Sequence, residues 1–523
     1  MREVQALQRL LADGKISRRD FMRQTSALGF SLAIASQLAG SAFADGHASP
    51  KHGGHFVVAG SGSSTDNYDP TTYESFFNAT LGRTFGDRLV RQNVDGSLLG
   101  ELAVDWYSND SLDVWTLKLR AGVEFHNGKS FVASDVVYSL GRHYGEGATS
   151  GAAGLLGDIT DIKAVDDETV EISLSSGNID FIFFLTDYHL IMQPEGSTDD
   201  GIGTGAFIVD GFDPGVRATF RRNPNYWNAP LPYYDSFELM IINDDTARTA
   251  ALQTGQVHAI ERVDLKTVDF LRQSPNVQIN NTSSRGHYNF IAHTDTNPFD
   301  NPDVVLALKY ALPRQQIIDQ VLGGFGGVGN DHPINSGFAL FEDAVAQREL
   351  DIDQARFHYE KSGHSGPIVL RTSQGAWPGS IDAALLFKES AQQAGMTIDV
   401  KREPNDGYWS DVWNVKPFSA SYWFPRATQG QIFTVAYTGD WNDTRFENAE
   451  FTELLRQTRT EADEAQRAQM YTRMQQLVHD NSGALIPVFN DYVDAIAKSV
   501  QGYENNPNGT LCDQRIQNIT WFA

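Results

Sequence analysis

The sequence is poor in cysteine and in positive charge, and both shortages exclude classes of protein. Cys512 is the single cysteine among 523 residues, so neither an internal disulfide framework nor a cysteine-based zinc site can form. Lysine and arginine number 41 against 66 aspartates and glutamates, which gives a formal net charge of −25. A nucleic-acid groove needs a basic stripe, and anionic membranes attract basic segments. The composition therefore argues against nucleic acid as a partner and against docking on a membrane surface.

The familiar catalytic and cofactor motifs are also missing. No G-x-S-x-G nucleophile elbow, no H-E-x-x-H zinc motif and no P-loop occurs. A G-x-G-x-x-G pattern at 324–329 follows a helical segment and precedes Asn330 and Pro333 instead of opening a helix, so we interpret it as a loop. An active site is not visible in the sequence, and we predict neither a cofactor nor an enzymatic activity. An exported hydrolase that uses Asp, Glu or Ser outside these motifs is the rival hypothesis.

Long apolar runs are absent after residue 44, so we expect no segment inserted in a membrane. The first 44 residues are typical of a twin-arginine export signal. Arg18 and Arg19 precede a short, mildly apolar stretch at 27–38, and 42–44 (Ala-Phe-Ala) is a pattern that signal peptidase accepts. No cysteine near this point could carry a lipid anchor. We therefore predict a periplasmic protein, exported by the twin-arginine route and not lipid-anchored; an amphipathic helix of the folded protein is the alternative.

Hydrophobic periodicity predicts α+β character with many short strands in the first half of the chain and a helix-rich part from about residue 300. A short apolar run predicts a strand at 55–60, and a period-two pattern predicts one at 115–120 that Val123 and Phe125 extend. Two further strands are expected within 161–174. Cap-like residues ahead of helical spacing predict later helices. The expected helix caps are Ser134 or Asp135, Asn301 ahead of Pro302, and a capping box at 460–463. A further helix is expected at 381–395 and a strand at 485–489.

Aromatic residues are plentiful, and many of them gather between residues 377 and 441 outside the periodic helices. A cluster of loop-borne rings around a cation is typical of a ligand pocket, although ordinary core packing is the alternative for each ring. The candidate ligand-binding residues are Trp377, Tyr408, Trp409, Trp423, Phe424 and Arg426.

Three histidines, His47, His52 and His55, lie in a polar, glycine-rich leader. Histidine-rich tracts can hold a metal, but a mobile terminus is the simpler explanation of this composition. We therefore predict no metal site and keep the binding of a metal chelate as an alternative function.

Several segments resemble the family 5 extracellular solute-binding proteins of ABC importers. The most specific is 119–128 (LRAGVEFHNG), which is followed by 131–140 (FVASDVVYSL). Other matching segments occur in the family's order at 203–207, 221–227, 251–258, 297–317, 467–480 and 486–488.

This resemblance implies two α/β lobes of the cluster C type around a hinge, with the ligand buried between them. Lobe I would comprise residues 45–284 and 487–523, and lobe II residues 285–486. A monomer would capture a small molecule and deliver it to the transmembrane permease and the cytoplasmic ATPase of an importer.

Two departures from the family pattern bear on the ligand. Peptide-binding relatives have an aspartate for the peptide ammonium three residues after a tryptophan, where this sequence has Arg426 after Trp423. Gln374 and its neighbours stand where dipeptide binders carry an arginine for the peptide carboxylate, and Trp409 matches an aromatic that packs on the ligand. We therefore expect Arg426 to meet an anionic group of a carboxylated amino-acid derivative, an opine-like compound or a short modified peptide. A structural salt bridge is the alternative role of Arg426.

Overall fold

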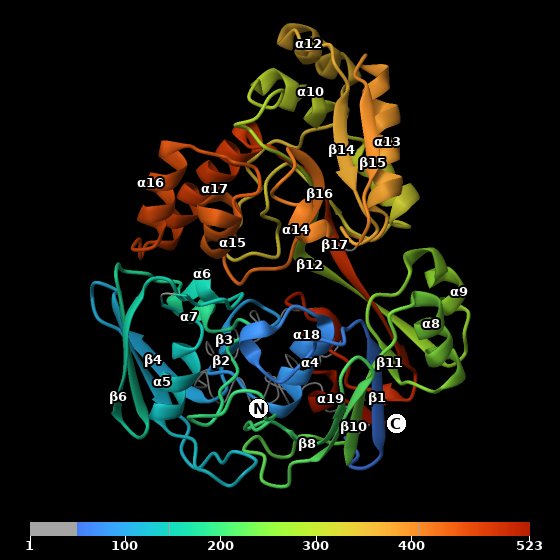
Figure 1. The fold of residues 1–523 in the computed structure, drawn as a ribbon. Coiled ribbons are helices and arrows are strands. Elements are labelled where there is room, and N and C mark those ends of the chain that lie inside the picture. Colours follow the sequence, from blue (N-terminus) through green and yellow to red (C-terminus); the bar gives the residue numbers. More distant parts are fainter. Residues whose placement is uncertain (1–49, 146, 406) are drawn as a thin grey trace, which may run out of the picture.

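The computed structural model describes residues 50–145, 147–405 and 407–523. The predicted export signal and His47 lie outside the described residues. Figure 1 shows two lobes, here named the lower lobe and the upper lobe. Within the described part of the chain, no helix is both long enough and apolar enough to cross a membrane.

The lower lobe contains most of the short strands. Its strands are β1 (His55–Gly60), β2 (Val90–Gln92), β3 (Leu98–Gly100), β4 (Ala103–Ser108), β5 (Val114–Leu119), β6 (Ile159–Asp166), β7 (Thr169–Leu174), β8 (Phe207–Asp213), β9 (Arg217–Arg222), β10 (Ser236–Ile241), β11 (Ala259–Ile260), β18 (Val500–Gln501) and β19 (Trp521–Phe522). Its helices are α4 (Phe76–Phe85), α5 (Ala133–Gly141), α6 (Ala153–Leu156), α7 (Phe181–Phe184), α8 (Asp245–Thr254), α9 (Val268–Arg272), α18 (Thr510–Gln514) and α19 (Ile516–Ile519).

The upper lobe is richer in helices. They are α10 (Pro302–Ala311), α11 (Arg314–Gln316), α12 (Ile352–Ser362), α13 (Ser380–Gln393), α14 (Tyr408–Asp411), α15 (Gln429–Tyr437), α16 (Ala449–Thr458) and α17 (Glu464–Asn481). Its strands are β13 (Gly327–Val328), β14 (Ile368–Thr372), β15 (Ile398–Arg402) and β16 (Phe418–Trp423).

One sheet runs through both lobes. Among the described residues it has 11 strands in the order β15-β14-β16-β12-β17-β11-β1-β10-β9-β8, with β13 paired to β17. The long antiparallel strands β12 (Val277–Ala292) and β17 (Ala484–Ala497) connect the lobes (Figure 1). Their pairing register shifts between Ser283 and His287 and again between Tyr288 and Phe290. The predicted changes of lobe, at 284/285 and 486/487, fall within these two strands.

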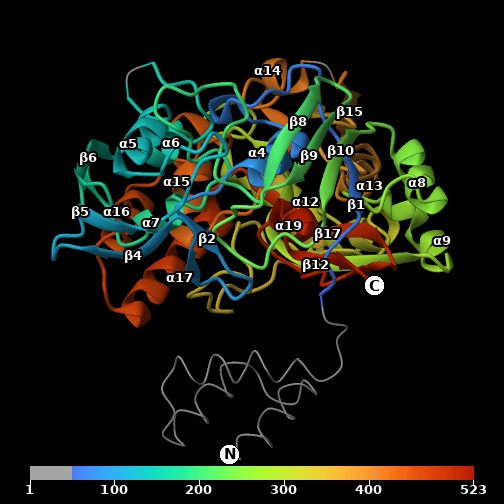
Figure 2. The ribbon, with the colours of Figure 1, turned by 90° about the horizontal axis from the view of Figure 1, so that it is seen from below.

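A second sheet extends the lower lobe sideways. Its four antiparallel strands have the order β4-β5-β7-β6, and the inward rings and aliphatic chains of β5 and β7 are buried. Seen from below, this sheet and helices α8 and α9 lie at opposite ends of the lobe (Figure 2). The pattern of many short strands in the first half of the chain is confirmed.

Local sequence signals predicted several elements correctly. The strand at 55–60 and the strand pair within 161–174 form as expected. Helix α10 begins with Pro302, and the side chain of Asn301 accepts a hydrogen bond from the backbone N–H of Asp303.

Three details of the local predictions are wrong. Helix α5 has its N-cap at Val132, because the buried Asp135 accepts from the Val132 N–H at 3.0 Å and pairs with Lys129. Helix α17 is capped by Asp463 alone and not by a capping box. Beyond β5 a turn at 121–122, with Gly122 at a left-handed φ of 73°, ends the strand, and the described chain then forms only an isolated bridge between Glu124 and Ser130.

Candidate functional site

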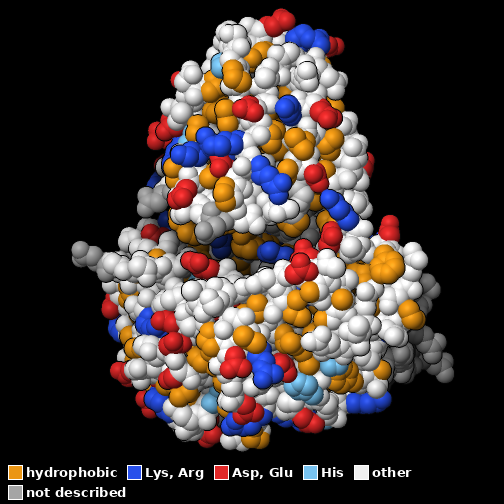
Figure 3. All heavy atoms as spheres, turned by 45° about the vertical axis from the view of Figure 1, so that its right-hand side comes forward, with side chains coloured by type: hydrophobic (Ala, Val, Ile, Leu, Met, Phe, Trp, Pro, Cys, Tyr) orange, Lys and Arg blue, Asp and Glu red, His pale blue; other side chains and the backbone are white. Residues whose placement is uncertain are grey.

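A cavity of about 510 Å³ lies between the two lobes. Figure 3 shows the surface hollowed along this junction, with acidic and basic side chains at its rim. Three of its wall segments, 61–66, 261–262 and 424–427, follow directly on strands β1, β11 and β16. Strands β1 and β11 are parallel, and β16 is parallel to β14. Ligands of α/β proteins bind outside the carboxyl ends of such strands, so the topology itself points to this cavity.

The cavity wall is strongly charged. Its ionisable acids and arginines are Asp66, Glu74, Asp187, Glu261, Asp513, Arg88, Arg262, Arg285 and Arg426. The Glu74 carboxylate is exposed and makes no hydrogen bond or ion pair with the described residues. Burial raises the pKa of Asp66, although the Ser63 N–H and the Ser75 hydroxyl donate to its carboxylate. Both signs of charge are therefore available to a ligand.

Arg426 projects from the upper lobe and has few partners of its own. One of its terminal nitrogens lies 3.7 Å from a carboxylate oxygen of Asp187 in the lower lobe, which is too long for a hydrogen bond. Its Nε is buried and unbonded within the described structure. Asp187 is bonded more closely to His189, whose Nδ1 lies at 2.6 Å. The donors of Arg426 are thus left available for an acceptor in the cavity.

Arg285 is a second cation without a carboxylate. It is 3% exposed and donates to the carbonyl oxygen of Ala427 at 3.3 Å and to the side-chain oxygen of Gln92 at 2.6 Å, and also to Asn508. Burial lowers the pKa of Arg285 to about 10, which still leaves it charged at neutral pH. Its hydrogen bonds therefore all go to neutral groups, and no carboxylate of the described residues pairs with it directly.

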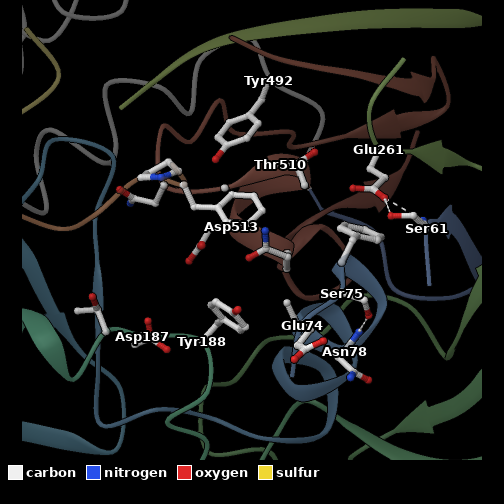
Figure 4. A pocket seen from close by; sticks show the side chains of 18 of the residues that line it. Ser61, Glu74, Ser75, Asn78, Asp187, Tyr188, Glu261, Tyr492, Thr510 and Asp513 are labelled. Carbon is white, nitrogen blue, oxygen red and sulfur yellow. Dashed lines mark hydrogen bonds between the residues drawn. The ribbon is translucent and has the colours of Figure 1, made fainter. Parts of the chain in front are cut away.

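Glu261 and Arg262 form the wall after β11. The Glu261 Oε1 accepts from the N–H and the hydroxyl of Ser61 at 2.8 and 2.5 Å (Figure 4), whereas its buried Oε2 accepts no hydrogen bond from the described residues. The nearest cation to Oε2 is the Arg262 Nε at 3.8 Å. Arg262 has a left-handed backbone with φ of 47°, and its side chain is half exposed. This wall offers one unfilled acceptor beside one loosely paired guanidinium.

The floor of the cavity includes an unusual turn at 511–514. All four residues are non-glycine and have left-handed φ values between 48° and 64°. Such residues cost roughly 1–2 kcal/mol each, so the turn needs support from its surroundings. The buried Asp494 supplies it by accepting from the Leu511 N–H at 2.7 Å and from the Thr510 hydroxyl. The turn presents Asp513 to Arg88 at 3.1 Å, and Figure 4 shows Asp513 beside the cavity.

Direct contacts join the lobes beside the cavity. Arg467 and the Tyr471 hydroxyl of the upper lobe lie 3.5 and 3.3 Å from Asp180 of the lower lobe. The side-chain amide of Gln92 donates to the Ala427 carbonyl at 3.1 Å. The two lobes are therefore in contact around the cavity in this structure.

The structure brings only part of the predicted aromatic cluster to the cavity. Arg426 and Phe424 line it. Trp409 does not, but its ring packs edge-on against Tyr422, which does line the cavity, with ring centroids 5.1 Å apart. Contact of these residues with a ligand stays a prediction.

The other three predicted residues are packed within the upper lobe and do not line the cavity. Trp377 is 2% exposed and stacks on Tyr288 with ring centroids 4.9 Å apart. Tyr408 is buried and donates its hydroxyl to the Ala420 carbonyl at 2.8 Å. Trp423 is the last residue of β16, and its side chain is buried, with 5% of its surface exposed. These three rings pack in the interior of the upper lobe, because neighbouring helices and strands cover them. Core packing was the alternative interpretation of each ring.

Most of the lower-lobe wall was missed by the sequence-based prediction. Its members come from positions as distant as Arg88 and Asp513, so no local pattern marks them as one group. A usable signal existed for Glu261 and Arg262, since two opposite charges directly follow the short segment 257–260 (Val-His-Ala-Ile), which ends in β11. Charged residues at the end of a parallel strand are a recognised position for binding groups.

The described histidines of the leader make protein contacts. His55 lies 2.8 Å from the Ser236 hydroxyl, and His52 packs near the Tyr233 ring. Within residues 50–145, 147–405 and 407–523, no group of three or more His, Cys, Asp or Glu side chains is placed to hold a metal ion.

The chain is similar to proteins of a known family. The family model of the bacterial extracellular solute-binding proteins, family 5 Middle, matches residues 97–445. The chain belongs to this family. Among curated relatives of this family 5 chain, heme-binding protein A of Haemophilus influenzae is 25% identical over 457 residues, which cover 78% of this chain and 82% of the relative.

Solved structures share the fold at low sequence identity. The periplasmic binding protein AgaA of A. tumefaciens R10, in complex with agropinic acid, matches with a TM-score of 0.80 at 20% identity and covers 90% of this chain and 99% of its own. The binding protein DppA of Helicobacter pylori, in complex with the peptide STSA, matches with a TM-score of 0.79 at 20% identity, covering 90% and 98%. The predicted two-lobed α/β fold of a solute-binding protein is thereby confirmed. Family 5 binding proteins deliver their ligands to an ABC permease and its ATPase.

Proposed function

We propose that this chain is the periplasmic substrate-binding component of an ABC importer and that it captures a small carboxylated solute between its lobes. The solute classes are amino-acid derivatives, opine-like compounds and short modified peptides. The observation that carries this proposal is Arg426, a cation that lines the inter-lobe cavity and makes no hydrogen bond with the described residues. A guanidinium in such a place binds a carboxylate through two parallel hydrogen bonds.

The size and polarity of the cavity support a small organic ligand. Its volume of about 510 Å³ falls in the range of small-molecule sites, roughly 300–1,000 Å³. The rings of Tyr188, Tyr422 and Phe424 supply apolar contact area. Glu74 and the free oxygen of Glu261 could accept an ammonium group, so a ligand with both signs of charge fits the wall.

The connection between the lobes supports a capture mechanism. We propose that β12 and β17 act as the hinge, with residues 45–284 and 487–523 moving against residues 285–486. The register shifts in this strand pair fall where the lobes meet, and irregular pairing there allows backbone torsions to change without breaking either core. Ligand binding would favour the closed arrangement, which the permease recognises.

Replacing Arg426 with alanine is expected to weaken ligand affinity by at least tenfold. A hydrogen bond to a charged group contributes about 1.5–3 kcal/mol, which corresponds to a factor of roughly 10–150 in affinity. Native mass spectrometry of freshly purified protein would identify a retained solute, and calorimetry would then measure its affinity for wild type and R426A.

Arg402 provides the matched control, because it is an exposed arginine of the same lobe on β15, away from the cavity. R402A should bind as wild type does. Equal affinity of R426A and wild type would remove Arg426 from the binding site and leave it the role of an inter-lobe salt bridge with Asp187.

A further inference from the structure

A second hollow, of about 300 Å³, lies in the lower lobe. It shares no lining residue with the inter-lobe cavity. Its walls come from β2, β3, the end of β5, the segment after β9 and the segment after α18. The lining side chains of interest are Arg91, Glu101, Arg120, Trp227, Asn228 and Arg515.

Arg515 is the unusual member of this group. The residue is only 8% exposed, yet its guanidinium makes no hydrogen bond and no ion pair within the described part of the chain. A guanidinium carries five N–H donors and cannot lose its charge at ordinary pH. A buried group of this kind needs an acceptor, and when the protein supplies none, water or an anion does so.

Two further arginines face the same hollow with spare donors. The Arg91 Nε lies 3.7 Å from a Glu101 oxygen, which is too long for a hydrogen bond. The central guanidinium carbon of Arg120 lies over the Trp227 ring, 4.3 Å from its centroid, and the Arg120 Nε donates to the Glu101 carbonyl at 2.8 Å. This cation–π contact holds the guanidinium beside the hollow and leaves its terminal nitrogens without a hydrogen bond to the described residues.

Glu101, the carboxylate in this hollow, is already occupied from the protein interior. The two terminal nitrogens of Arg83 donate to its two oxygens at 3.1 and 3.3 Å, and the Arg88 backbone N–H donates at 3.2 Å. Although burial alone would raise it, Arg83 and Arg515 hold the pKa of Glu101 well below its usual range. Glu101 is hydrogen-bonded to Arg83, and it is the one carboxylate that lines this hollow beside the guanidinium groups of Arg91, Arg120 and Arg515, so positive charge is in excess there.

This charge pattern contrasts with the rest of the molecule. The chain has a formal net charge of −25, yet this hollow holds three arginines and one carboxylate, and such a local excess of partly buried positive charge favours the binding of an anion. Burial lowers the pKa of Arg91 to about 10, and repulsion from the nearby charge of Arg515 contributes to this shift. A singly charged anion would leave most of this repulsion in place.

We propose that this hollow is a binding site for a small multivalent oxyanion, held by the guanidinium groups of Arg515, Arg91 and Arg120. Phosphate and sulfate offer several oxygens in a compact tetrahedron, and arginine matches such oxygens in pairs. The Asn228 amide lies in the same wall and can add a further donor. The site is distinct from the inter-lobe cavity and does not depend on the identity of the transported solute.

Calorimetric titration of sodium phosphate into the full chain tests this site, with sodium chloride at equal ionic strength as the reference. We expect saturable binding of one phosphate, and parallel titrations with sulfate and citrate separate a compact oxyanion from a larger polycarboxylate. R515Q should weaken phosphate binding at least tenfold, and R91Q should weaken it several-fold.

Two controls separate this site from general charge effects and from the proposed transport function. R221Q removes an exposed lower-lobe arginine that pairs with Asp210 and should leave phosphate binding unchanged. R426A alters the inter-lobe cavity and should also leave it unchanged. If R515Q does not fold, R91Q alone decides the matter, because Arg91 is partly exposed and makes a single long contact. Absence of saturable binding above the chloride reference, or equal binding by wild type, R515Q and R91Q, would overturn the proposal.

Discussion

D331N is expected to destabilise the upper lobe by about 3–5 kcal/mol, the usual cost of removing one partner from a buried ion pair. Asp331 is fully buried, and Arg314 donates to both of its oxygens at 2.6 and 2.7 Å. Arg348 donates to it at 3.0 Å, and so does the backbone N–H of Ile486. Although burial alone would raise it, nearby buried cations hold the pKa of Asp331 at about 2.

The reason for the large effect is the charge left behind. Arg314 and Arg348 are both more than nine-tenths buried. Without Asp331, Arg314 would be a buried cation with no carboxylate partner among the described residues, and Arg348 would keep only the half-exposed Asp480 at 3.7 Å. Asparagine is the appropriate replacement because Asp331 has a left-handed φ of 55°, which asparagine tolerates and alanine does not. D331N thus changes the charge while keeping size and backbone preference.

Urea denaturation followed by tryptophan fluorescence measures this effect, since the upper lobe contains Trp377 and Trp423. D353N is the matched control. Asp353 lies in the first turn of α12, its side chain is 92% exposed, and it pairs with Arg356. Its expected effect is below about 1 kcal/mol, as for other surface pairs. Similar unfolding midpoints for D331N and D353N would contradict the assigned role of Asp331.

The second large effect concerns the pH dependence of stability and depends on Asp443. This residue is 1% exposed. The indole N–H of Trp413 donates to its carboxylate at 3.1 Å, and Trp423 at the end of β16 donates to it as well. It has no cationic partner among the described residues. Burial raises the pKa of Asp443 to about 7 despite these donors.

The sign of the pH effect follows from comparing the folded and unfolded states. Between about pH 4 and pH 7 the folded chain holds a proton at Asp443 that the unfolded chain has lost, so stability falls as the pH rises through this range. From pH 5 to pH 8 this contribution amounts to roughly 2.5 kcal/mol. D443N removes the titrating group, and the advantage of D443N over wild type should therefore grow by about this amount between pH 5 and pH 8.

Urea denaturation at several pH values from 5 to 8 checks this prediction, with each variant compared to wild type at the same pH. D411N is the control, because it makes the same change in an exposed carboxylate of the same lobe. A constant difference between D443N and wild type across this range would show that Asp443 does not titrate there.

Much of the architecture follows from short-range sequence patterns. Strand β1 follows from a short apolar run and the opening of α10 from capping residues, and both signals act over a few positions along the chain. The cap of α5 was misjudged because a tertiary contact decided it, namely the pairing of Asp135 with Lys129. Local patterns are reliable only where no distant partner competes for the same side chain.

The binding site shows the same division. The sequence by itself identified the family, the two-lobed fold and Arg426 as an unusual charge next to Trp423. Tertiary structure alone decided that Trp377 and Tyr408 are covered by neighbouring elements and that Arg88 meets Asp513 across 425 positions. Burial and charge pairing depend on which distant segments are packed together, and one-dimensional periodicity does not encode that. The same is true of Arg515, whose lack of a partner becomes visible only when every side chain around it has been placed.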